Sequence, residues 1–378
     1  MIDFNRPHLT GKETHYIYQA VADGKISGNG AFTKCCQQFF EERYGFNKCL
    51  LTTSCTDALE MAAILCDVRP GDEVIVPSYT FVSSALAFVR AGAKIVFADS
   101  MKSNPNIDAE QIESLITPRT KVIVPVHYAG VACDMDRIME IANKYNLIVV
   151  EDAAQAIDSY YKGRPLGGIG HMSAFSFHET KNIISGEGGM LCINDERFIR
   201  RAEIIWEKGT NRAEFFRGEV NKYGWVDTGS SFLPSEVIAA FLWAQLENLD
   251  DIQSRRKHLW ELYYTHLSPL ASRLSPSLAL PNLPDYATNN AHMFYLVCNN
   301  LEQRTALIKH LKENDIQAVF HYLGLHSSPY YMDKHDGHAL PECDRYADCL
   351  VRLPIFYDLK DEQVIEVCEI IKRYYQTL

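Results

Sequence analysis

Short apolar runs alternate with amphipathic stretches along the first half of the chain. The apolar runs lie at residues 74–77, 94–99, 121–127 and 147–152, and helical spacing of apolar residues follows at 81–91, 108–116 and 135–145. Continuous apolar strands separated by amphipathic helices are typical of a parallel sheet covered on both faces. The pattern therefore predicts a large α/β domain.

Two other stretches extend this picture. Apolar residues around Ser176 indicate a short strand that enters the core, after which the chain becomes polar and then rich in glycine. Residues 268–286 are rich in proline and serine, which predicts an irregular segment. Because 378 residues exceed what one core usually organises, we expect a large and a smaller domain.

The composition is ordinary for a globular protein, with 47% hydrophobic and 22% charged residues. A net charge of −11 disfavours nucleic acid as a partner, although a local pocket could still bind a small anion. The sequence contains no apolar run of signal-peptide or membrane-spanning length, so we expect a cytoplasmic protein without a membrane partner. Its 11 cysteines are scattered without a CxxC pair, which predicts reduced thiols, no disulfide framework and no metal site.

Ligands of open α/β sheets bind beyond the carboxyl ends of the strands. This rule selects residues 78–81, His127 with Tyr128, and residues 152–155. Asp152 ends an apolar strand, where a carboxylate is costly unless it meets a cation or hydrogen-bond donors. It could pair with a basic side chain, cap the next helix, or stabilise a protonated pyridine nitrogen.

A helix start at Ser54 is a candidate phosphate site. Ser54 and Asp57 fit a helix-capping pattern ahead of the apolar helix face at residues 58–65. The free N–H groups of Cys55 and Thr56, with the hydroxyls of Ser54 and Thr56, suit a phosphate. Most capped helices bind no phosphate, so this motif alone does not establish a phosphate site.

Lys181 lies between the apolar strand and the glycine cluster at residues 185–189. It is either a solvated loop lysine or an amine whose charge is destabilised, so that it can act as a nucleophile. A phosphate site, an aspartate at a strand end and a lysine in a later loop are together what a pyridoxal-phosphate enzyme requires. The three features together indicate such an enzyme more specifically than any one of them does alone.

Four motifs carry a resemblance to a known family: VPSYTFVSSALA, EDAAQA, SFHETKN and SGEGG, in this order. They resemble the sugar aminotransferases of the DegT/DnrJ/EryC1/StrS family, and the resemblance extends from residues 24–45 to residues 353–359. It implies the fold of aspartate aminotransferase, fold type I. Residues 1–250 would form a large domain that binds pyridoxal phosphate (PLP), with a mostly parallel sheet covered by helices, and residues 251–378 a small α+β domain.

The resemblance also implies roles at the matching positions. Lys181 is similar to the lysine that bonds to the cofactor, Asp152 to the partner of its pyridine nitrogen, and Gln155 to the residue beside its ring hydroxyl. The remaining cofactor contacts implied are Phe81 over the ring, and Ser54, Cys55, Thr56 and Ser176 at the phosphate. His178 is either a pocket residue that contacts the substrate or a core histidine.

The chain departs from the family at a GxNxR pattern, where it has GSSFL at residues 229–233. Ser231 can still offer a hydroxyl, whereas Leu233 replaces the arginine. The resemblance implies a homodimer with shared active sites, in which Ser231 reaches the cofactor phosphate of the neighbouring subunit. The apolar run at residues 230–249 is either part of that interface or a helix buried inside one subunit.

Three segments, PVHYAGVACDMD, EKGTNRAEFFRG and NAHMFYL, resemble family members that act at C4 of a dTDP-linked sugar. The resemblance implies transfer of an amino group from L-glutamate, through pyridoxamine phosphate, to a dTDP-4-keto-6-deoxyhexose. The product would be dTDP-4-amino-4,6-dideoxygalactose, or its glucose epimer, for a cell-surface polysaccharide. The alternatives are amination at C3 and a non-catalytic PLP-binding regulator; dehydratases of this fold carry histidine where this chain has Lys181.

Substrate contacts are predicted in two places. The loop at residues 207–225 could clamp a nucleotide diphosphate, or it is a charged surface loop; its basic residues are Lys208, Arg212, Arg217 and Lys222. The other candidates are His127, Tyr128, His321, Tyr322 and His326, although residues 321–326 also fit a plain strand-to-loop junction.

Overall fold

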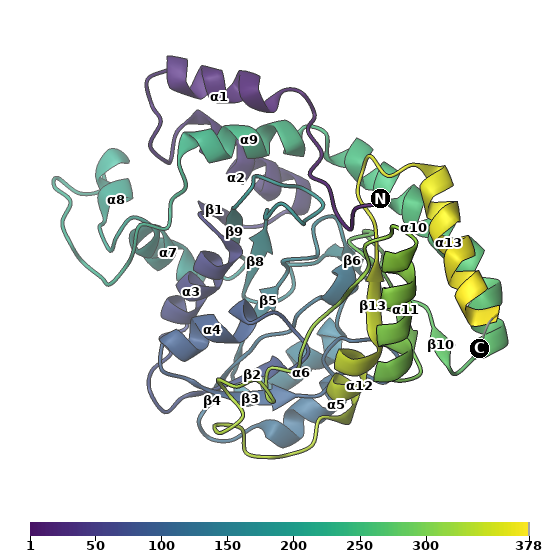
Figure 1. Ribbon diagram of the computed structural model, residues 1–378. Coiled ribbons are helices and arrows are strands. Elements are labelled where there is room, and N and C mark those ends of the chain that lie inside the picture. The colour runs from purple at the N-terminus through teal and green to yellow at the C-terminus, as the bar shows by residue number, and fades with distance from the viewer. Residues whose placement is uncertain (377–378) are drawn as a thin grey trace.

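A computed structural model describes residues 1–376 of the chain, which are built around a seven-stranded sheet (Figure 1). The strand order is β1 (Lys48–Thr52), β9 (Gly189–Ile193), β8 (Met172–Ser176), β5 (Ile148–Asp152), β4 (Thr120–Ile123), β2 (Glu73–Pro77) and β3 (Lys94–Ala98). Neighbouring strands are parallel except at β9, which is antiparallel to both β1 and β8. The mostly parallel α/β sheet predicted from the sequence is confirmed.

Both faces of this sheet are buried. Successive residues of one strand alternate between two core clusters: Val74 and Val76 face one, and Ile75 faces the other. The covering helices are α2 (Ala31–Tyr44), α3 (Cys55–Leu65), α4 (Ser83–Arg90), α5 (Ala109–Ile112), α6 (Met135–Tyr145) and α7 (Ile199–Trp206), with short 3-10 turns at Glu113–Leu115, Tyr128–Gly130 and Glu196–Phe198. Since hydrophobic layers lie on both sides, the strands read as continuous apolar runs.

The C-terminal part forms a second, antiparallel sheet with its own core cluster. Its strand order is β10 (Leu278–Ala279), β11 (Phe294–Cys298), β13 (Leu350–Leu353) and β12 (Val319–Phe320), and its helices are α11 (Leu301–Glu313), α12 (Pro341–Cys349) and α13 (Asp361–Gln376). The long helix α10 (Leu249–Leu274) leads into it (Figure 1). The predicted domain boundary after residue 250 falls near the start of α10 and stays a prediction.

A further pair of short strands, β6 (Tyr160–Tyr161) and β7 (Arg164–Pro165), lies beside the main sheet, and α8 (Arg212–Phe216) projects from it (Figure 1). Across the described part of the chain, every helix is too short or too polar to cross a membrane.

Two sequence predictions need correction. The irregular segment begins only after Leu274, because residues 268–274 are the last turns of α10 and include Pro269. Leu267 and Leu270 are buried in the C-terminal core, which outweighs the cost of a proline inside a helix. The predicted strand at 121–127 ends at Ile123.

The apolar run at residues 230–249 forms α9 (Glu236–Leu246) only after Pro234. Helix α9 packs against both α2 and α1 (Glu13–Ala22), which bury Ala239, Leu242 and Leu246 and leave Ile238 and Phe241 partly exposed (Figure 1). Glu236 at its start accepts hydrogen bonds from the N–H groups of Gly30 and Phe32 at the N-terminus of α2. Of the two alternatives for this run, the structure favours a helix buried inside one subunit.

Candidate active site

A cavity of about 620 Å³ opens at the carboxyl ends of the central strands. It lies between the main sheet and the C-terminal sheet, which contributes residues from β12 and β13. The predicted site residues that line it are Ser54, Cys55, Thr56, Phe81, Asp152, Gln155, Ser176, His178, Lys181, His321 and Tyr322. Segments that are more than 250 residues apart in sequence therefore meet around one space.

The start of helix α3 forms one wall of this cavity. Ser54 is the N-cap and accepts a hydrogen bond at its Oγ from the Asp57 N–H (3.1 Å), as the capping pattern predicted. The amides of Cys55 and Thr56 precede the first intrahelical bond, so they remain available to an anion. Gly189 on β9 permits this arrangement, because a Cβ at that position would lie 2.4 Å from the Cys55 nitrogen.

Asp152 is 5% exposed and lies at the end of β5. Its Oδ2 accepts a hydrogen bond from Ser84 Oγ (2.6 Å), and its Oδ1 accepts one from the Ala154 N–H (3.1 Å). Among the described residues, no basic side chain lies within ion-pair distance of Asp152, so a simple structural ion pair is not its role. The carboxylate therefore remains suited to a cationic group bound in the cavity.

Lys181 is half-buried on the turn after β8, where its backbone N–H donates to the His178 carbonyl (2.9 Å). Burial lowers the pKa of the Lys181 amine; Cys55 and Asp152 oppose that shift, and the positive charge of Arg352 adds to it. A lowered pKa increases the fraction of neutral amine. Of the two alternatives for Lys181, this environment favours the nucleophile over the solvated loop lysine.

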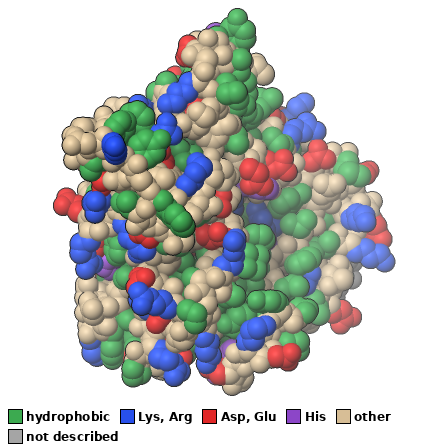
Figure 2. All heavy atoms as spheres, turned by 90° about the vertical axis from the view of Figure 1, so that its left-hand side faces the viewer, with side chains coloured by type: hydrophobic (Ala, Val, Ile, Leu, Met, Phe, Trp, Pro, Cys, Tyr) green, Lys and Arg blue, Asp and Glu red, His purple; other side chains and the backbone are tan. Residues whose placement is uncertain are grey.

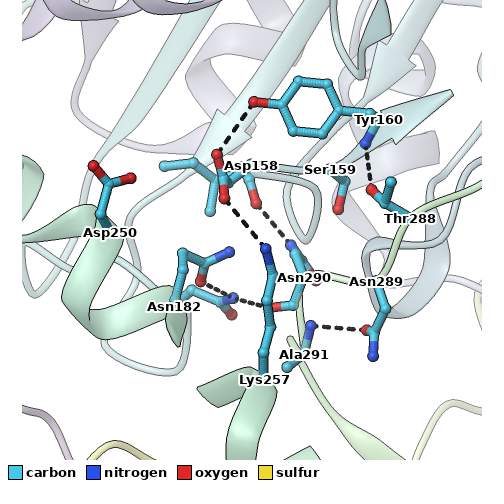
Figure 3. Close-up of polar contacts among 12 residues, drawn as sticks. Asp158, Ser159, Tyr160, Asn182, Asp250, Lys257, Thr288, Asn289, Asn290 and Ala291 are labelled. Carbon is cyan, nitrogen blue, oxygen red and sulfur yellow. Dashed lines mark hydrogen bonds and ion pairs between the residues drawn. The ribbon is translucent and has the colours of Figure 1, made fainter. Parts of the chain in front are cut away.

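The residue after Lys181 fixes this turn in place. The Asn182 amide donates to the Asn290 carbonyl (2.9 Å), and its oxygen lies 2.9 Å from Nδ1 of His292. The Asn290 amide in turn donates to the Gln155 carbonyl (2.8 Å). Figure 3 shows Asn182 and Asn290 side by side. The segment before β11 thus joins the Lys181 turn to the Gln155 loop.

Aromatic side chains line the mouth of the cavity. Phe81 is 56% exposed, and its ring lies 6.1 Å from the ring of Tyr322. Tyr322 also accepts a hydrogen bond from the Gln155 amide (3.2 Å). Because Phe81 lines the cavity and is more than half exposed, a flat aromatic ligand can stack on it.

Two basic residues of the cavity were missed at the sequence level. Arg352 on β13 and His292 line the cavity. Arg352 has a buried Nε without a hydrogen-bond partner in the described chain, its Nη1 lies 3.2 Å from Nε2 of His321, and burial lowers its pKa. The signal for Arg352 is an arginine between apolar residues in the strand LVRL; His292 has no comparable signal.

His127 and Tyr128 do not line this cavity, which corrects their prediction as pocket residues. His127 is fully buried, and its Nε2 lies 2.9 Å from Oε2 of Glu151. Its Nδ1 accepts a hydrogen bond from the Cys133 N–H (3.2 Å), so Nε2 carries the proton that is donated to Glu151. His326 is likewise outside the cavity, with its Nδ1 2.8 Å from Ser78 Oγ.

Replacing Glu151 with glutamine is expected to destabilise the fold by about 3 kcal/mol at neutral pH. Glu151 is fully buried and also accepts hydrogen bonds from the N–H groups of Gly167 (2.7 Å) and Ile169 (2.8 Å), so an NH₂ group would oppose these donors. Urea unfolding measures the difference. Exposed Glu140, which pairs with Arg137 (3.0 Å), provides a control whose change to glutamine leaves the midpoint unchanged.

The same variant tests a pH dependence. Burial raises the pKa of Glu151, but hydrogen bonds from His127 and from backbone amides outweigh it and hold the pKa below its ordinary value of 4.5. The carboxylate therefore contributes stability above about pH 4.5, and this contribution is lost as the pH falls through the lower folded value. The gap between wild type and Glu151→Gln should narrow in acid; a gap that is constant from pH 7 to pH 3 contradicts this.

The predicted basic substrate residues lie elsewhere in the chain. A second cavity, of about 820 Å³, is lined by Ser231, Lys208, Arg212 and Arg217, together with Lys25, Lys34 and Lys48. Figure 2 shows the side of the molecule from which α8 projects, where basic and hydrophobic side chains are interspersed. Lys222 lines neither cavity. Within one chain, these residues are therefore not brought together with Lys181, as their prediction as substrate contacts requires.

Comparison with known proteins agrees with this geometry. The sequence profile of the DegT/DnrJ/EryC1/StrS aminotransferase family matches residues 7–372. The chain belongs to this family.

Relatives and solved structures cover nearly all of the chain. It is 32% identical to the spore coat polysaccharide biosynthesis protein SpsC of Bacillus subtilis (strain 168), over 98% of this chain and 96% of the relative. It is 32% identical to GDP-perosamine synthase of Escherichia coli O157:H7, over 98% of this chain and 97% of that enzyme. The putative sugar aminotransferase Spr1654 from Streptococcus pneumoniae, in its PMP form, superimposes with a TM-score of 0.91 at 25% identity and covers 100% of both chains.

As a member of this family, the protein is a PLP-dependent aminotransferase of fold type I; Spr1654 has also been solved in a PLP form. The residues that line the cavity also fit this cofactor, independently of the comparison with relatives. It combines free amides at the start of α3, the carboxylate of Asp152 without a basic partner, and the amine of Lys181 with its lowered pKa.

Proposed function

We propose that the protein transfers the amino group of L-glutamate to C4 of a dTDP-4-keto-6-deoxyhexose, as a dTDP-4-amino-4,6-dideoxygalactose transaminase or the enzyme for its glucose epimer. The observation that carries the aminotransferase chemistry is the single cavity in which Lys181, Asp152 and the start of α3 meet. Relatives named for GDP-perosamine synthesis and for a spore coat polysaccharide support a nucleotide-sugar substrate and a role in polysaccharide biosynthesis.

In this proposal, different residues of the cavity bind different parts of the cofactor. The amides of Cys55 and Thr56 and the hydroxyls of Ser54 and Ser176 would hold the phosphate. Asp152 would stabilise the protonated pyridine nitrogen, Gln155 would contact the ring hydroxyl, and Phe81 would stack on the ring. When bound, the cofactor delocalises the electron pair left behind when a Cα–H bond breaks.

Lys181 moves the proton. Its pKa is lowered, so its Nζ can be neutral when substrate arrives and can accept the proton from Cα of the amino donor. The same Nζ returns the proton on the other side of the exchange. Asp152 adds a nearby negative charge that stabilises the amine once it is protonated.

Arg352 supports an anionic amino donor. A buried guanidinium without a carboxylate partner is costly, and a substrate carboxylate would satisfy it. We assign Arg352 to a carboxylate of L-glutamate. His321 lies 3.2 Å from Nη1 of Arg352 and burial lowers its pKa well below the usual range, so it is neutral and does not repel the cationic guanidinium.

A product assay tests this function. The purified protein with PLP is incubated with dTDP-4-keto-6-deoxyglucose and L-glutamate, and NMR identifies the aminated carbon and the stereochemistry at C4. Formation of 2-oxoglutarate and a C4 amine is the expected result. A product aminated at C3 would show the alternative specificity, and a visible spectrum that no amino acid changes would favour the non-catalytic regulator.

We also propose a homodimer with shared active sites. In its own chain, Ser231 lies in the second cavity, apart from Lys181. The same side exposes large hydrophobic side chains, with Phe216 69% and Trp225 83% exposed. A second copy of the chain would cover them and bring Ser231 to the cofactor phosphate of the partner subunit.

Mixing two inactive variants is expected to restore activity. Lys181→Ala lacks the amine, and Ser231→Glu places a negative charge at the phosphate of the partner subunit, where like charges repel. After subunit exchange, one site of each mixed dimer combines intact groups from both parents. Mixed dimers are then expected to recover about half of the wild-type activity per dimer, because one of their two sites is intact.

The control is Ser114→Glu, an exposed serine on the 3-10 turn Glu113–Leu115, which should stay fully active. Subunit exchange is verified with two distinguishable tags. Verified mixed dimers without any recovery, or a monomer that is fully active at low concentration, would contradict shared sites.

A further inference from the structure

A cluster of histidines and aspartate lies in the loop between β12 and α12, outside both cavities. One ring nitrogen each of His335 and His338 and a carboxylate oxygen of Asp336 all lie within 4.8 Å of one another. Nδ1 of His338 is 2.5 Å from Asp336 Oδ1, and Nδ1 of His335 is 3.6 Å from the same oxygen. Two ring nitrogens thus converge on one carboxylate oxygen.

Backbone carbonyls determine which ring nitrogens carry a proton. Nε2 of His338 lies 2.9 Å from the Phe97 carbonyl, and Nε2 of His335 lies 2.9 Å from the His338 carbonyl. Carbonyl oxygens only accept, so both Nε2 atoms must donate a proton. In the neutral rings, both Nδ1 atoms then carry lone pairs that face the carboxylate. Acceptors that face one another in this way are stabilised by a positive charge between them, either a proton on Nδ1 of His338, which lies at hydrogen-bond distance from Asp336, or a bound metal ion.

We propose that His335, Asp336 and His338 bind a divalent transition-metal ion of the Zn²⁺ type. Metal-ligating histidines commonly donate their other ring N–H to a backbone carbonyl, as both rings do here. Imidazole ligands favour Zn²⁺ over Mg²⁺ or Ca²⁺, which prefer oxygen. The cysteine spacing predicted no metal site, but this cluster contains no cysteine.

The ligand spacing is close to what the ion requires. Zn–N and Zn–O bonds of about 2.0 Å in a tetrahedral site separate two ligand atoms by about 3.3 Å. The pair formed by His335 and Asp336, at 3.6 Å, has to close slightly, and the pair formed by His338 and Asp336, at 2.5 Å, has to open by less than about 1 Å. Asp336 is half exposed, so a water molecule completes the coordination from the solvent side.

The ion would fasten this loop to the main sheet. His338 is already bonded to Phe97 on β3, and Asp99 just beyond β3 accepts a hydrogen bond from the Cys343 N–H (2.7 Å) at the start of α12. The ring of His326 lies 5.3 Å from that of His335, but its Nδ1 is committed to Ser78. The inference does not depend on the proposed function, because none of these residues lines the cavity of Lys181.

Isothermal titration of the chelator-treated, PLP-loaded protein with ZnCl₂ tests the site, with MgCl₂ as a comparison. We expect the wild-type protein to bind one Zn²⁺ ion per chain. Asp336→Asn should lose this binding, or bind Zn²⁺ with an affinity lower by at least about 100-fold. His335→Ala and His338→Ala should have the same effect. Co²⁺ titration of the same proteins, followed by visible absorption, reports imidazole coordination directly.

Another histidine–aspartate pair of this chain provides the matched control. His258 and Asp361 lie 2.7 Å apart on the surface, and His258→Ala should leave Zn²⁺ binding unchanged. Asp336→Asn keeps the size of the side chain, so it remains informative if a histidine variant fails to fold. Zn²⁺ binding that is equal in wild type and Asp336→Asn, or wild-type affinity no better than millimolar, would overturn the proposal.

Discussion

Replacing Lys181 with alanine is expected to reduce transamination by at least about 10,000-fold while the protein stays folded. In the proposed reaction, Lys181 would supply the amine that bonds to the cofactor, and its Nζ would carry the proton. The surroundings lower the pKa of this amine, whereas free alkylamines in solution are protonated at neutral pH. Among the described residues, Lys181 is the one lysine that lines the cavity, so no other lysine can replace it there.

The half-reaction with L-glutamate measures this effect through 2-oxoglutarate release, and circular dichroism checks the fold. The start of α3 is unchanged in the variant, so PLP should still bind through its phosphate. Lys309, an exposed lysine on α11, is the matched control, and Lys309→Ala should keep wild-type activity. Activity close to wild type in purified Lys181→Ala would rule out the assigned role.

Much of the main sheet could be predicted from the sequence, because its strands are buried on both faces. The apolar run at 74–77 forms most of β2, and the run at 94–99 forms β3 and the residue after it. The helix predicted at 135–145 is α6. Parallel strands end at the same edge, so the sequence also predicted that Asp152 and Phe81 would meet there.

The strand β5 shows what the pattern could not settle. Asp152 and the preceding Glu151 are both carboxylates at the end of one apolar strand, and successive side chains of a strand point to opposite faces. Asp152 points into the cavity, whereas Glu151 points to the other side and binds His127. Sequence alone placed His127 at the correct edge but could not tell which carboxylate it would meet.

Contacts from the C-terminal sheet were also beyond the sequence. Arg352 reaches the cavity because β13 lies beside β12 and the two sheets face each other across it. Nothing in the local pattern specifies how one sheet is placed against another, because that depends on packing between segments far apart in sequence. The same holds for α9, which packs against both α1 and α2.

Replacing Asp152 with asparagine is expected to lower kcat by about 1,000-fold while the cofactor stays bound. An amide keeps the shape of the side chain and can still bond to Ser84 and Ala154, the two partners of the carboxylate. It carries no charge, so it cannot keep a pyridine nitrogen protonated as a carboxylate does. The loss should therefore appear in kcat rather than in the amount of bound PLP.

Two further variants make this result specific. Ser84→Ala removes the 2.6 Å hydrogen bond to Asp152 but keeps the charge, so its loss of kcat should be much smaller, about tenfold. Asp250→Asn, at an 80% exposed side chain, should behave as wild type. Single-turnover kinetics with L-glutamate and the absorption spectrum of bound PLP separate rate from occupancy. If Asp152→Asn turns over near the wild-type rate, the carboxylate serves only to hold the loop at Ala154, and the cation in the cavity needs another partner.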